Sequence, residues 1–291
     1  MDGTSFMQSI INGLMIGGVY ALFAVGLTII FGVMDIVNFA HGEFLMLGMY
    51  LTWALSRFFP GVPYWLIIIV APIMYVIGYF VYKLSVAKII GKGHGLYILL
   101  TLGIGVILQN GALLLFSSDY RSINSVIKSA AINYGHFTIP TGRLIAFIMA
   151  IVCVIILNFF LNRTNLGRAM RATGEKSEVA KLLGINTEKT FAIAFGLGIM
   201  LAGISGLLLS PIFYTYPRVG VLFQTTAFVV VVLGGMGNVV GALIGGLIIG
   251  VMEALTGAYI SLDLSILSTF VIFLLLLFFR PYGLFGKARG I

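Results

Sequence analysis

Residues 3–34 read GTSFMQSIINGLMIGGVYALFAVGLTIIFGVM and contain no charged side chain. A helix needs about 20 mostly apolar residues to cross about 30 Å of hydrocarbon. The preceding residues contain an acid and no lysine or arginine, and no short apolar core with a cleavage site follows. The stretch therefore predicts a first membrane helix rather than a cleaved signal peptide.

The composition extends this prediction to the whole chain. Of its 291 residues, 60% are hydrophobic and 9% are charged, whereas about a quarter of the residues in a soluble domain are charged. The bilayer is therefore the expected solvent. Cys153 is the single cysteine, so an internal disulfide is excluded and a packed thiol is expected.

The distribution of basic residues predicts the topology. Most lysines and arginines fall in three clusters, and the positive-inside rule places these in the cytoplasm. The clusters are Lys83, Lys88 and Lys92; Arg163, Arg168, Arg171, Lys176, Lys181 and Lys189; and Arg280, Lys287 and Arg289. The N-terminus is then outside and the C-terminus cytoplasmic. The net charge of +8 indicates topology and contact with anionic lipids rather than nucleic-acid binding.

We expect a single all-α polytopic membrane domain over residues 1–291, with about nine membrane segments and a range of eight to ten. The pair around 219–259 is either two spans or re-entrant. We also expect a short helix in the outer loop 118–142 and a cytoplasmic segment at 162–189. The expected spans are 6–31, 37–56, 64–84, 94–117, 143–161, 190–212, 219–236, 238–259 and 263–280.

Two sequence patterns bear on how these helices are arranged. A faint parallel repeat aligns GVMDIVNFAHGEFLMLG (32–48) with GGMGNVVGALIGGLIIG (234–250), as in transporters built from two halves. Small residues at every fourth position favour close helix packing in lipid, either within this chain or with a second subunit. These residues are Gly198, Ala202 and Gly206 in one helix, and Gly237, Gly241 and Gly245 in another.

An enzymatic function has little support. The three histidines, His41, His94 and His136, fall on different segments, and His41-Gly-Glu43 lacks the paired histidines of a zinc protease helix. The sequence has no G-x-x-x-x-G-K-[ST] phosphate loop. We therefore expect no catalytic residue, no metal site and no ATP hydrolysis by this chain.

The cytoplasmic segment 162–189, NRTNLGRAMRATGEKSEVAKLLGINTEK, is the most informative part of the sequence. Ser177 is the expected N-cap of a short helix, and Gly184 is its expected left-handed end. Such a short helix is marginal alone, so its apolar face is expected either to dock in a groove of another protein or to lie on the membrane. That face consists of Val179, Leu182 and Leu183.

Four motifs carry a family resemblance. EVAKLLG (178–184) resembles the E-A-A-x-x-x-G coupling motif of ABC importer permeases, with Val179 in place of one alanine. With IVNFAHGE (36–43), TNLGRAMRATGE (164–175) and GGMGNVVGALIGG (234–246), the chain resembles branched-chain amino-acid ABC importer permeases from end to end. The resemblance is to the H-type subunit of the leucine/isoleucine/valine system.

The resemblance implies an M-type partner permease, two cytoplasmic ATPases that hold ATP and Mg²⁺, and a periplasmic binding protein. It also implies that segment 164–186 contains the helix that couples the permease to an ATPase. The residues implied for coupling are Arg168, Arg171, Glu178, Ala180, Leu182, Leu183 and Gly184.

Polar residues within the membrane segments are candidates for the pathway, because such residues usually face a cavity or a partner. Asn38 is expected to N-cap the second span at its cytoplasmic end, with His41 and Glu43 on opposite sides of that helix. Interhelical hydrogen bonding is the alternative role. The candidates are Asn38, His41, Glu43, Gln109, Asn110 and Glu253.

The resemblance implies a translocation subunit in the bacterial inner membrane. It would move amino acids, with leucine, isoleucine and valine the first expectation, after a periplasmic binding protein delivers them. Within the same family, the substrate could instead be urea, a short amide or another amino acid. An ion-coupled secondary transporter is the alternative from a different class; it would use Glu43 or Glu253 as its coupling carboxylate.

Overall fold

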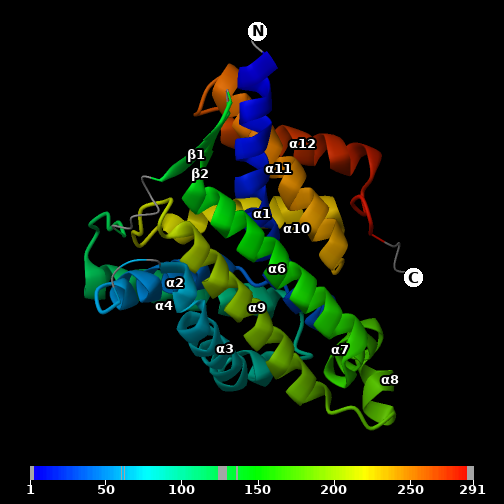
Figure 1. Cartoon of the computed structure of the whole chain (residues 1–291). Helices are drawn as coiled ribbons and strands as arrows, with labels where there is room; N and C mark the ends of the chain where they lie inside the picture. Colours follow the sequence, from blue (N-terminus) through cyan, green and yellow to red (C-terminus); the bar gives the residue numbers. More distant parts are fainter. Residues whose placement is uncertain (1–2, 60, 62, 124–129, 136, 287–291) are drawn as a thin grey trace.

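The computed structural model describes residues 3–59, 61, 63–123, 130–135 and 137–286, and within these the chain is mostly helical. His136, Lys287 and Arg289, which entered the sequence predictions, lie outside the described residues. Figure 1 shows the long helices crossing one another in a single bundle. The helices are α1 (Gly3–Met34), α2 (His41–Ser56), α3 (Ile67–Leu84), α4 (His94–Phe116), α6 (Thr141–Arg163), α7 (Asn165–Glu175), α8 (Ser177–Leu182), α9 (Thr187–Leu209), α10 (Val219–Gly234), α11 (Val239–Tyr259) and α12 (Ser265–Phe279), with 3₁₀ turns η1 (Pro63–Leu66) and η2 (Val86–Ile89).

Within the described residues, six helical segments are long and apolar enough to cross a membrane. They are α1, η1–α3–η2, α4, α6, α9 and α11. The helices α2 and α10 have 16 residues each and α12 has 15, fewer than the roughly 20 needed for a full crossing. The predicted polytopic helical fold is therefore confirmed, whereas the predicted count of nine spans is not.

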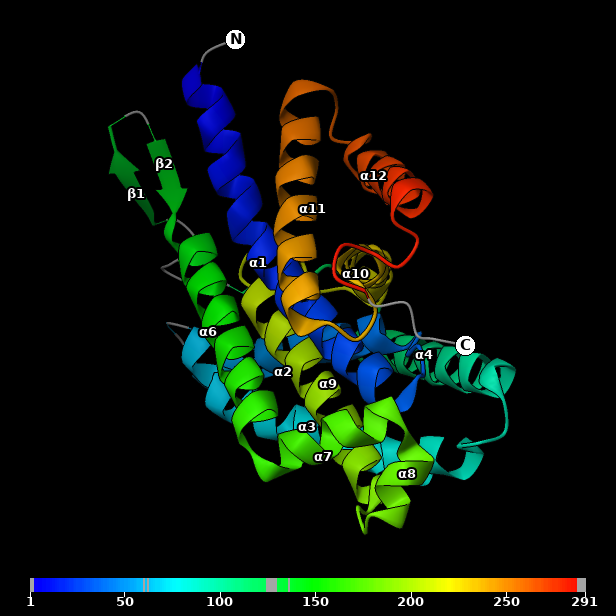
Figure 2. The same cartoon turned by 90° about the vertical axis from the view of Figure 1, so that its right-hand side faces the viewer.

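The long helices α1 and α9 are the most deeply buried in the core of the bundle, and α1 packs closely against α11. A Cβ on Gly13 would overlap the backbone of Val251, and one on Gly17 would overlap the carbonyl of Gly246. These glycines bring α1 and α11 into backbone contact along several turns, and the two helices lie side by side in both views (Figures 1 and 2). Close contact through small residues is the usual way in which helices associate in lipid.

The two short helices α2 and α10 run toward opposite ends of this core. α2 runs alongside α4: Glu43 lies beside Gly105, and Tyr50 stacks on Phe116 near the C-terminal end of α4. In contrast, α10 ends where Gly234 contacts Gly241, in the first turn of α11.

A β-hairpin lies beside the N-terminal part of α1 (Figure 2). Strand β1 (Ala131–Tyr134) pairs antiparallel with β2 (Phe137–Pro140). The Gln8 side chain of α1 donates to the Thr138 carbonyl at 2.7 Å and accepts from the Thr138 N–H at 3.0 Å. The described part of the loop 118–142 thus contains a hairpin; the short helix expected in this loop remains a prediction, since residues 124–129 lie outside that part.

Candidate functional site

The IVNFAHGE stretch leads from the end of α1 back into the interior of the bundle, where α2 begins. Asp35 ends α1 with a φ of 57°, and the chain then turns back on itself. The Nε2 atom of His41 lies 3.1 Å from the carbonyl oxygen of Phe23, and the two rings stack at 4.7 Å. Phe23 precedes Met34, the end of α1, by eleven residues, or about 16 Å of helix. The prediction that α2 starts at the end of the first helix is therefore wrong.

Neighbouring helices place this start near mid-depth. Glu43 contacts Gly105, the central residue of α4: its Oε2 atom lies 3.5 Å from where a Cβ on Gly105 would be. His41 packs against Gly26, which in turn contacts Gly198 at the centre of α9. His41 and Glu43 thus face different helices, as the sequence predicts, at about the same level of the bundle.

The first turns of α2 and α10 meet at this point. Gly42 and Gly220 are in backbone contact, since a Cβ on either would overlap the carbonyl of the other. The Gln224 side chain, one turn further along α10, accepts from the Gly42 N–H at 2.6 Å and donates to the Asn38 carbonyl at 3.4 Å. We call this meeting point, formed by residues 38–43 and 219–224, the α2–α10 junction.

Asn38 does not cap α2 as predicted. The N-cap position is Ala40, and the Asn38 Oδ1 accepts from the Ala40 N–H at 3.1 Å, two residues on. Asn38 thus forms an Asx-type turn with the residue two positions on, in the non-helical stretch that precedes α2, and not a cap on the first turn of the helix.

The three polar residues of the stretch are buried and incompletely hydrogen-bonded. Asn38 and His41 are fully buried and Glu43 is 8% exposed. Among the residues that the structure describes, no partner is found for the Asn38 Nδ2, the His41 Nδ1 or the Glu43 Oε2. Buried polar groups normally have partners, so this cluster calls for a functional explanation.

The other candidate pathway residues lie elsewhere. Gln109 is half-buried on α4, and Asn110 is exposed and donates to the Val106 carbonyl of its own helix at 2.8 Å. Glu253 of α11 accepts from the Thr269 hydroxyl of α12 at 3.1 Å and is hydrogen-bonded to Tyr20 of α1. The structure thus gives Glu253 interhelical hydrogen bonds and does not bring it to the α2–α10 junction.

The coupling segment forms two helices rather than the single short one predicted. Thr164 caps α7, accepting from the Gly167 N–H at 3.0 Å. Helix α8 begins after Lys176, without a side-chain cap, so the prediction of Ser177 as N-cap is wrong by one residue. Gly184 ends the turn with a φ of 83°, as predicted.

The apolar face of α8 points away from the rest of the described chain. Leu182 is 87% exposed, Leu183 is 76% exposed and Val179 is 46% exposed, whereas Ala180 is buried. Both arginines lie on α7, where Arg168 bonds the Asn165 side chain and Arg171 bonds the Asn162 side chain. Helices α7 and α8 lie at one end of the bundle (Figure 1), and the coupling residues on and after them are exposed, apart from Ala180.

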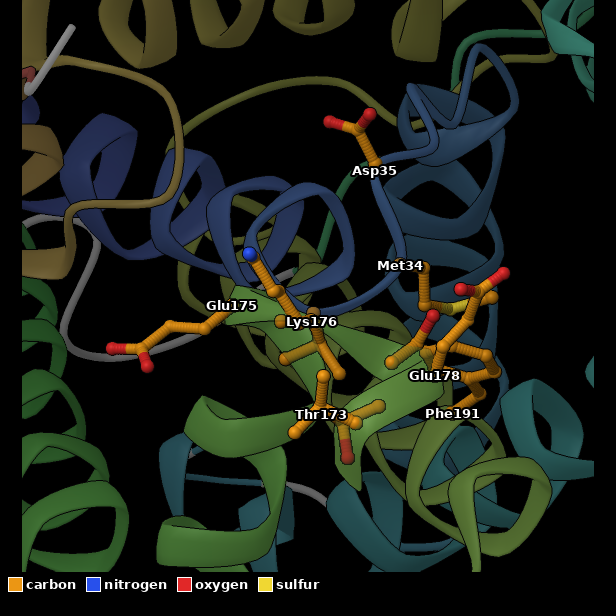
Figure 3. A pocket seen from close by; sticks show the side chains of 11 residues that line it. Met34, Asp35, Thr173, Glu175, Lys176, Glu178 and Phe191 are labelled. Atoms are coloured by element: carbon orange, nitrogen blue, oxygen red, sulfur yellow. The ribbon is translucent and has the colours of Figure 1, made fainter. Parts of the chain in front are cut away.

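A pocket of about 370 Å³ lies between part of this segment and the end of α1. It is lined by Met34, the last residue of α1, by Asp35, which follows it, by residues 173–179, and by Phe191 of α9. Glu178 lies beside Met34 and Phe191, whereas the Glu175 carboxyl points away from them (Figure 3). No group of three or more His, Cys, Asp or Glu side chains in the described residues is arranged to hold a metal ion.

The small-residue faces pack against the chain's own helices. Gly198 contacts Gly26 and Ile30 of α1, and Gly206 contacts the Leu45 carbonyl of α2, with Ala202 fully buried between them. The second stripe faces other parts of the chain in the same way: Gly237 lies against Gly32 of α1, Gly241 against Gly234 of α10, and Gly245 against Val230 of α10.

Comparison with known proteins identifies the family. Residues 9–279 match the model of a family described as branched-chain amino acid transport system / permease component. The chain belongs to this family. It is an integral membrane permease component, and the resemblance in its motifs is confirmed.

Curated relatives of this permease component match over almost their whole length. It is 31% identical to the high-affinity branched-chain amino acid transport system permease protein LivH of Salmonella typhimurium, over 97% of this chain and 96% of the relative. It is 30% identical, with the same coverage, to the corresponding protein BraD of Pseudomonas aeruginosa. No solved structure matches the chain.

Sequence reasoning missed Gln224, Gly220 and Gly174. Gln224 is an isolated polar residue in the apolar run VGVLFQTTAF, and the same signal had selected Gln109 and Glu253. No sequence signal distinguishes Gly220 or Gly174, because their importance depends on which helices cross at them.

Proposed function

We infer that this chain is the permease subunit of an ATP-driven ABC importer of amino acids, with leucine, isoleucine and valine as the first substrates to test. The observation that carries this proposal is the family match from residue 9 to residue 279, with relatives named for branched-chain amino acid transport. Urea, short amides and other amino acids are the alternative substrates.

The proposed assembly has a second, M-type permease, two cytoplasmic ATPases, a periplasmic binding protein and surrounding lipid. ATP and Mg²⁺ bind to the ATPases, and this chain binds no cofactor. The proposal of an ATPase contact is supported by the exposed apolar face of α8, because a helix of six residues gains little stability by itself. Its Leu182 and Leu183 side chains suit a groove on a partner.

We place the N-terminus outside and the C-terminus in the cytoplasm of an inner-membrane protein, with 162–189 as a coupling segment within one domain. Support comes from the concentration of basic residues in that segment and at Lys83, Lys88 and Lys92, because loops rich in lysine and arginine usually lie in the cytoplasm. ATP-driven closure of the ATPases then moves the coupling segment and, with it, the membrane helices.

The test is uptake of labelled leucine by the complete complex in proteoliposomes, comparing wild type with the Gly184→Asp and Glu178→Arg variants. Both variants are expected to lose ATPase co-purification and at least nine-tenths of uptake. Gly91→Asp is the matched control, because Gly91 has nearly the same φ, 82°, and equally open surroundings. Normal uptake by Gly184→Asp and Glu178→Arg would refute the coupling role.

Two further results would change the functional assignment. Uptake of urea but not of leucine would replace branched-chain amino acids by urea as the assigned substrate. Uptake that persists without the ATPases and collapses with the ion gradient would instead establish a secondary transporter.

A further inference from the structure

We propose that the α2–α10 junction is a transient binding site for a zwitterionic α-amino acid, with the substrate carboxylate held at the two helix N-termini. The choice of ligand rests on the proposed function; the site itself rests on the geometry of the junction.

The first argument is the meeting of two helix N-termini inside the bundle. α2 and α10 each have 16 residues, long enough to develop a dipole. Their first turns are in backbone contact at Gly42 and Gly220. N-terminal N–H groups and the positive dipole ends favour an anion, and interrupted helices in transporters direct such ends at carboxylates.

The second argument is the set of buried polar groups that the fold leaves without partners. The Asn38 side chain is held at the start of α2 by the Ala40 N–H, and its Nδ2 donor has no partner among the described residues. A carboxylate oxygen is an acceptor that this donor lacks. Asn38 is fully buried, so water at the surface of the bundle does not supply the acceptor.

Glu43 supplies the opposite charge. It lies in the same first turn of α2, more than nine-tenths buried, and its Oε2 has no partner within the described part of the chain. An ionised carboxylate in a membrane protein usually faces a cavity or a charged partner, and an ammonium group is such a partner. The donors for a carboxylate lie on the side of α2 that meets α10, and the acceptor for an ammonium lies in the same turn on the side that meets Gly105 of α4. An α-amino acid bound here would direct its ammonium group toward α4.

Gln224 occupies the place of the ligand in this structure. Its Oε1 accepts from the Gly42 N–H at 2.6 Å, as a substrate carboxylate oxygen would. The side chain comes from α10, whereas the N–H belongs to α2, so movement of the two helices relative to each other removes the amide and exposes the site. Gln224 is therefore assigned as a stand-in for the substrate carboxylate in the closed junction.

The experiment compares two substitutions at position 224. Gln224→Glu places a permanent carboxylate at the junction and is expected to lower leucine uptake by the complete complex at least tenfold, without lowering the Tm of the permease. Gln224→Ala removes the amide without adding a charge and is expected to lower uptake less than Gln224→Glu does. A purely structural hydrogen bond predicts the reverse, with loss in Gln224→Ala and near-normal uptake in Gln224→Glu, and that result would overturn the proposal.

Thermal protection tests binding directly. Millimolar leucine is expected to raise the Tm of the Gln224→Ala permease in detergent and to leave that of Gln224→Glu unchanged. Two compounds probe the two ends of the ligand. Leucine methyl ester lacks the free carboxylate. 4-Methylpentanoate lacks the ammonium group, and it is tested in Glu43→Gln, where the proposed carboxylate partner of that group is also absent. The ester is expected to give no protection, and equal protection by ester and leucine would contradict the carboxylate site.

Asn110→Asp is the control, because it adds a carboxylate to an exposed position of α4 whose side chain bonds only its own helix; it is expected to leave leucine protection of a Gln224→Ala background intact. If the wild-type complex fails to take up any branched-chain amino acid, the proposed function fails. Acetate then tests the site alone, since it is expected to protect Gln224→Ala but not Gln224→Glu. Failure of acetate to do so would remove the site as well.

Discussion

The carbonyl oxygen of Gly32, in the last turn of α1, lies against the Cα of Gly174 in α7, so closely that a Cβ on Gly174 would overlap it. Gly32 also packs against Gly237, in the turn between α10 and α11, where a Cβ on Gly32 would lie 3.1 Å from the Gly237 Cα. We therefore expect a movement of α7 to reach the end of α1 and, through Gly32, the turn that follows α10. The end of α1 leads through residues 35–40 into the α2–α10 junction, and α10 joins the junction at its opposite end.

Replacement of Gly174 by valine is expected to separate ATP hydrolysis from transport. The side chain would force α7 away from α1, because the overlapping atom belongs to the backbone and cannot turn aside. The expected result is retained co-purification of the ATPases with at least tenfold lower leucine uptake per ATP hydrolysed. Gly103→Val is the control, since a Cβ there has open space; wild-type uptake in Gly174→Val would disprove this relay.

The exposed leucines of α8 lead to a prediction on assembly. Changing Leu182 and Leu183 to serine removes apolar surface that is free in this chain, so the Tm of the isolated permease should stay within about 1 °C, since exposed substitutions have small effects. Co-purification of the ATPases should fall at least tenfold. Leu262→Ser is the comparison, because this leucine is 81% exposed in the loop between α11 and α12. Equal ATPase recovery from the two variants would count against docking of α8.

Glu253 is expected to act in stability more than in transport. Its bonds to Thr269 and Tyr20 join α11 to α12 and α1, and an interhelical hydrogen bond in a membrane contributes about 0.6 kcal/mol on average. Glu253→Leu should therefore lower the free energy of unfolding by about 1 kcal/mol, measured by unfolding in mixed micelles, while Glu253→Gln keeps an acceptor and most of the stability. A complete loss of uptake in stable Glu253→Gln protein would show a pathway role instead.

Trp53, near the end of α2, is expected to stabilise the adjoining loops. The guanidinium groups of Arg57 and Arg121 each lie 4.3 Å from the centre of its ring, and such cation–π contacts contribute about 0.5–1 kcal/mol each at exposed sites. Trp53→Leu should lower the free energy of unfolding by about 1–2 kcal/mol.

The second tryptophan of the chain provides the control for this measurement. Trp65 is 43% exposed and makes an edge-on contact with Phe59, so Trp65→Leu is expected to have the smaller effect. Because Arg121 also pairs with Thr215 through two backbone hydrogen bonds, limited proteolysis near 117–121 should accelerate in Trp53→Leu and not in Trp65→Leu. The opposite order of the two variants would contradict the assignment.

The long helices were predictable because a bilayer requires them. Every backbone polar group in hydrocarbon must be satisfied, so a charge-free run such as 3–34 can only be helical. Gly184 was predictable for a local reason, since a glycine after a short amphipathic stretch commonly takes the left-handed conformation that ends a helix.

The half-length helices could not be predicted in the same way. Residues 210–217, before α10, carry no charge, so hydropathy does not show where the chain turns back inside the bundle. Non-helical backbone at membrane depth is tolerated where protein buries it, and Ile36 and Asn38 are almost completely buried. The burial depends on α10, which is distant in sequence, and for the same reason Gln224 was missed as the partner of Gly42.

The short helix α12 gives the protein a sensitivity to the thickness of the bilayer. Its 15 residues span about 22 Å, whereas the hydrocarbon layer is about 30 Å thick, and Phe278 and Phe279 on its last turn are largely exposed. Lipid beside α12 must thin or the helix must shift, at a cost of a fraction of a kcal/mol per Å of mismatch. Because Thr269 of α12 bonds Glu253 of α11, we expect the length of the lipid acyl chains to change the stability of the contact between these two helices.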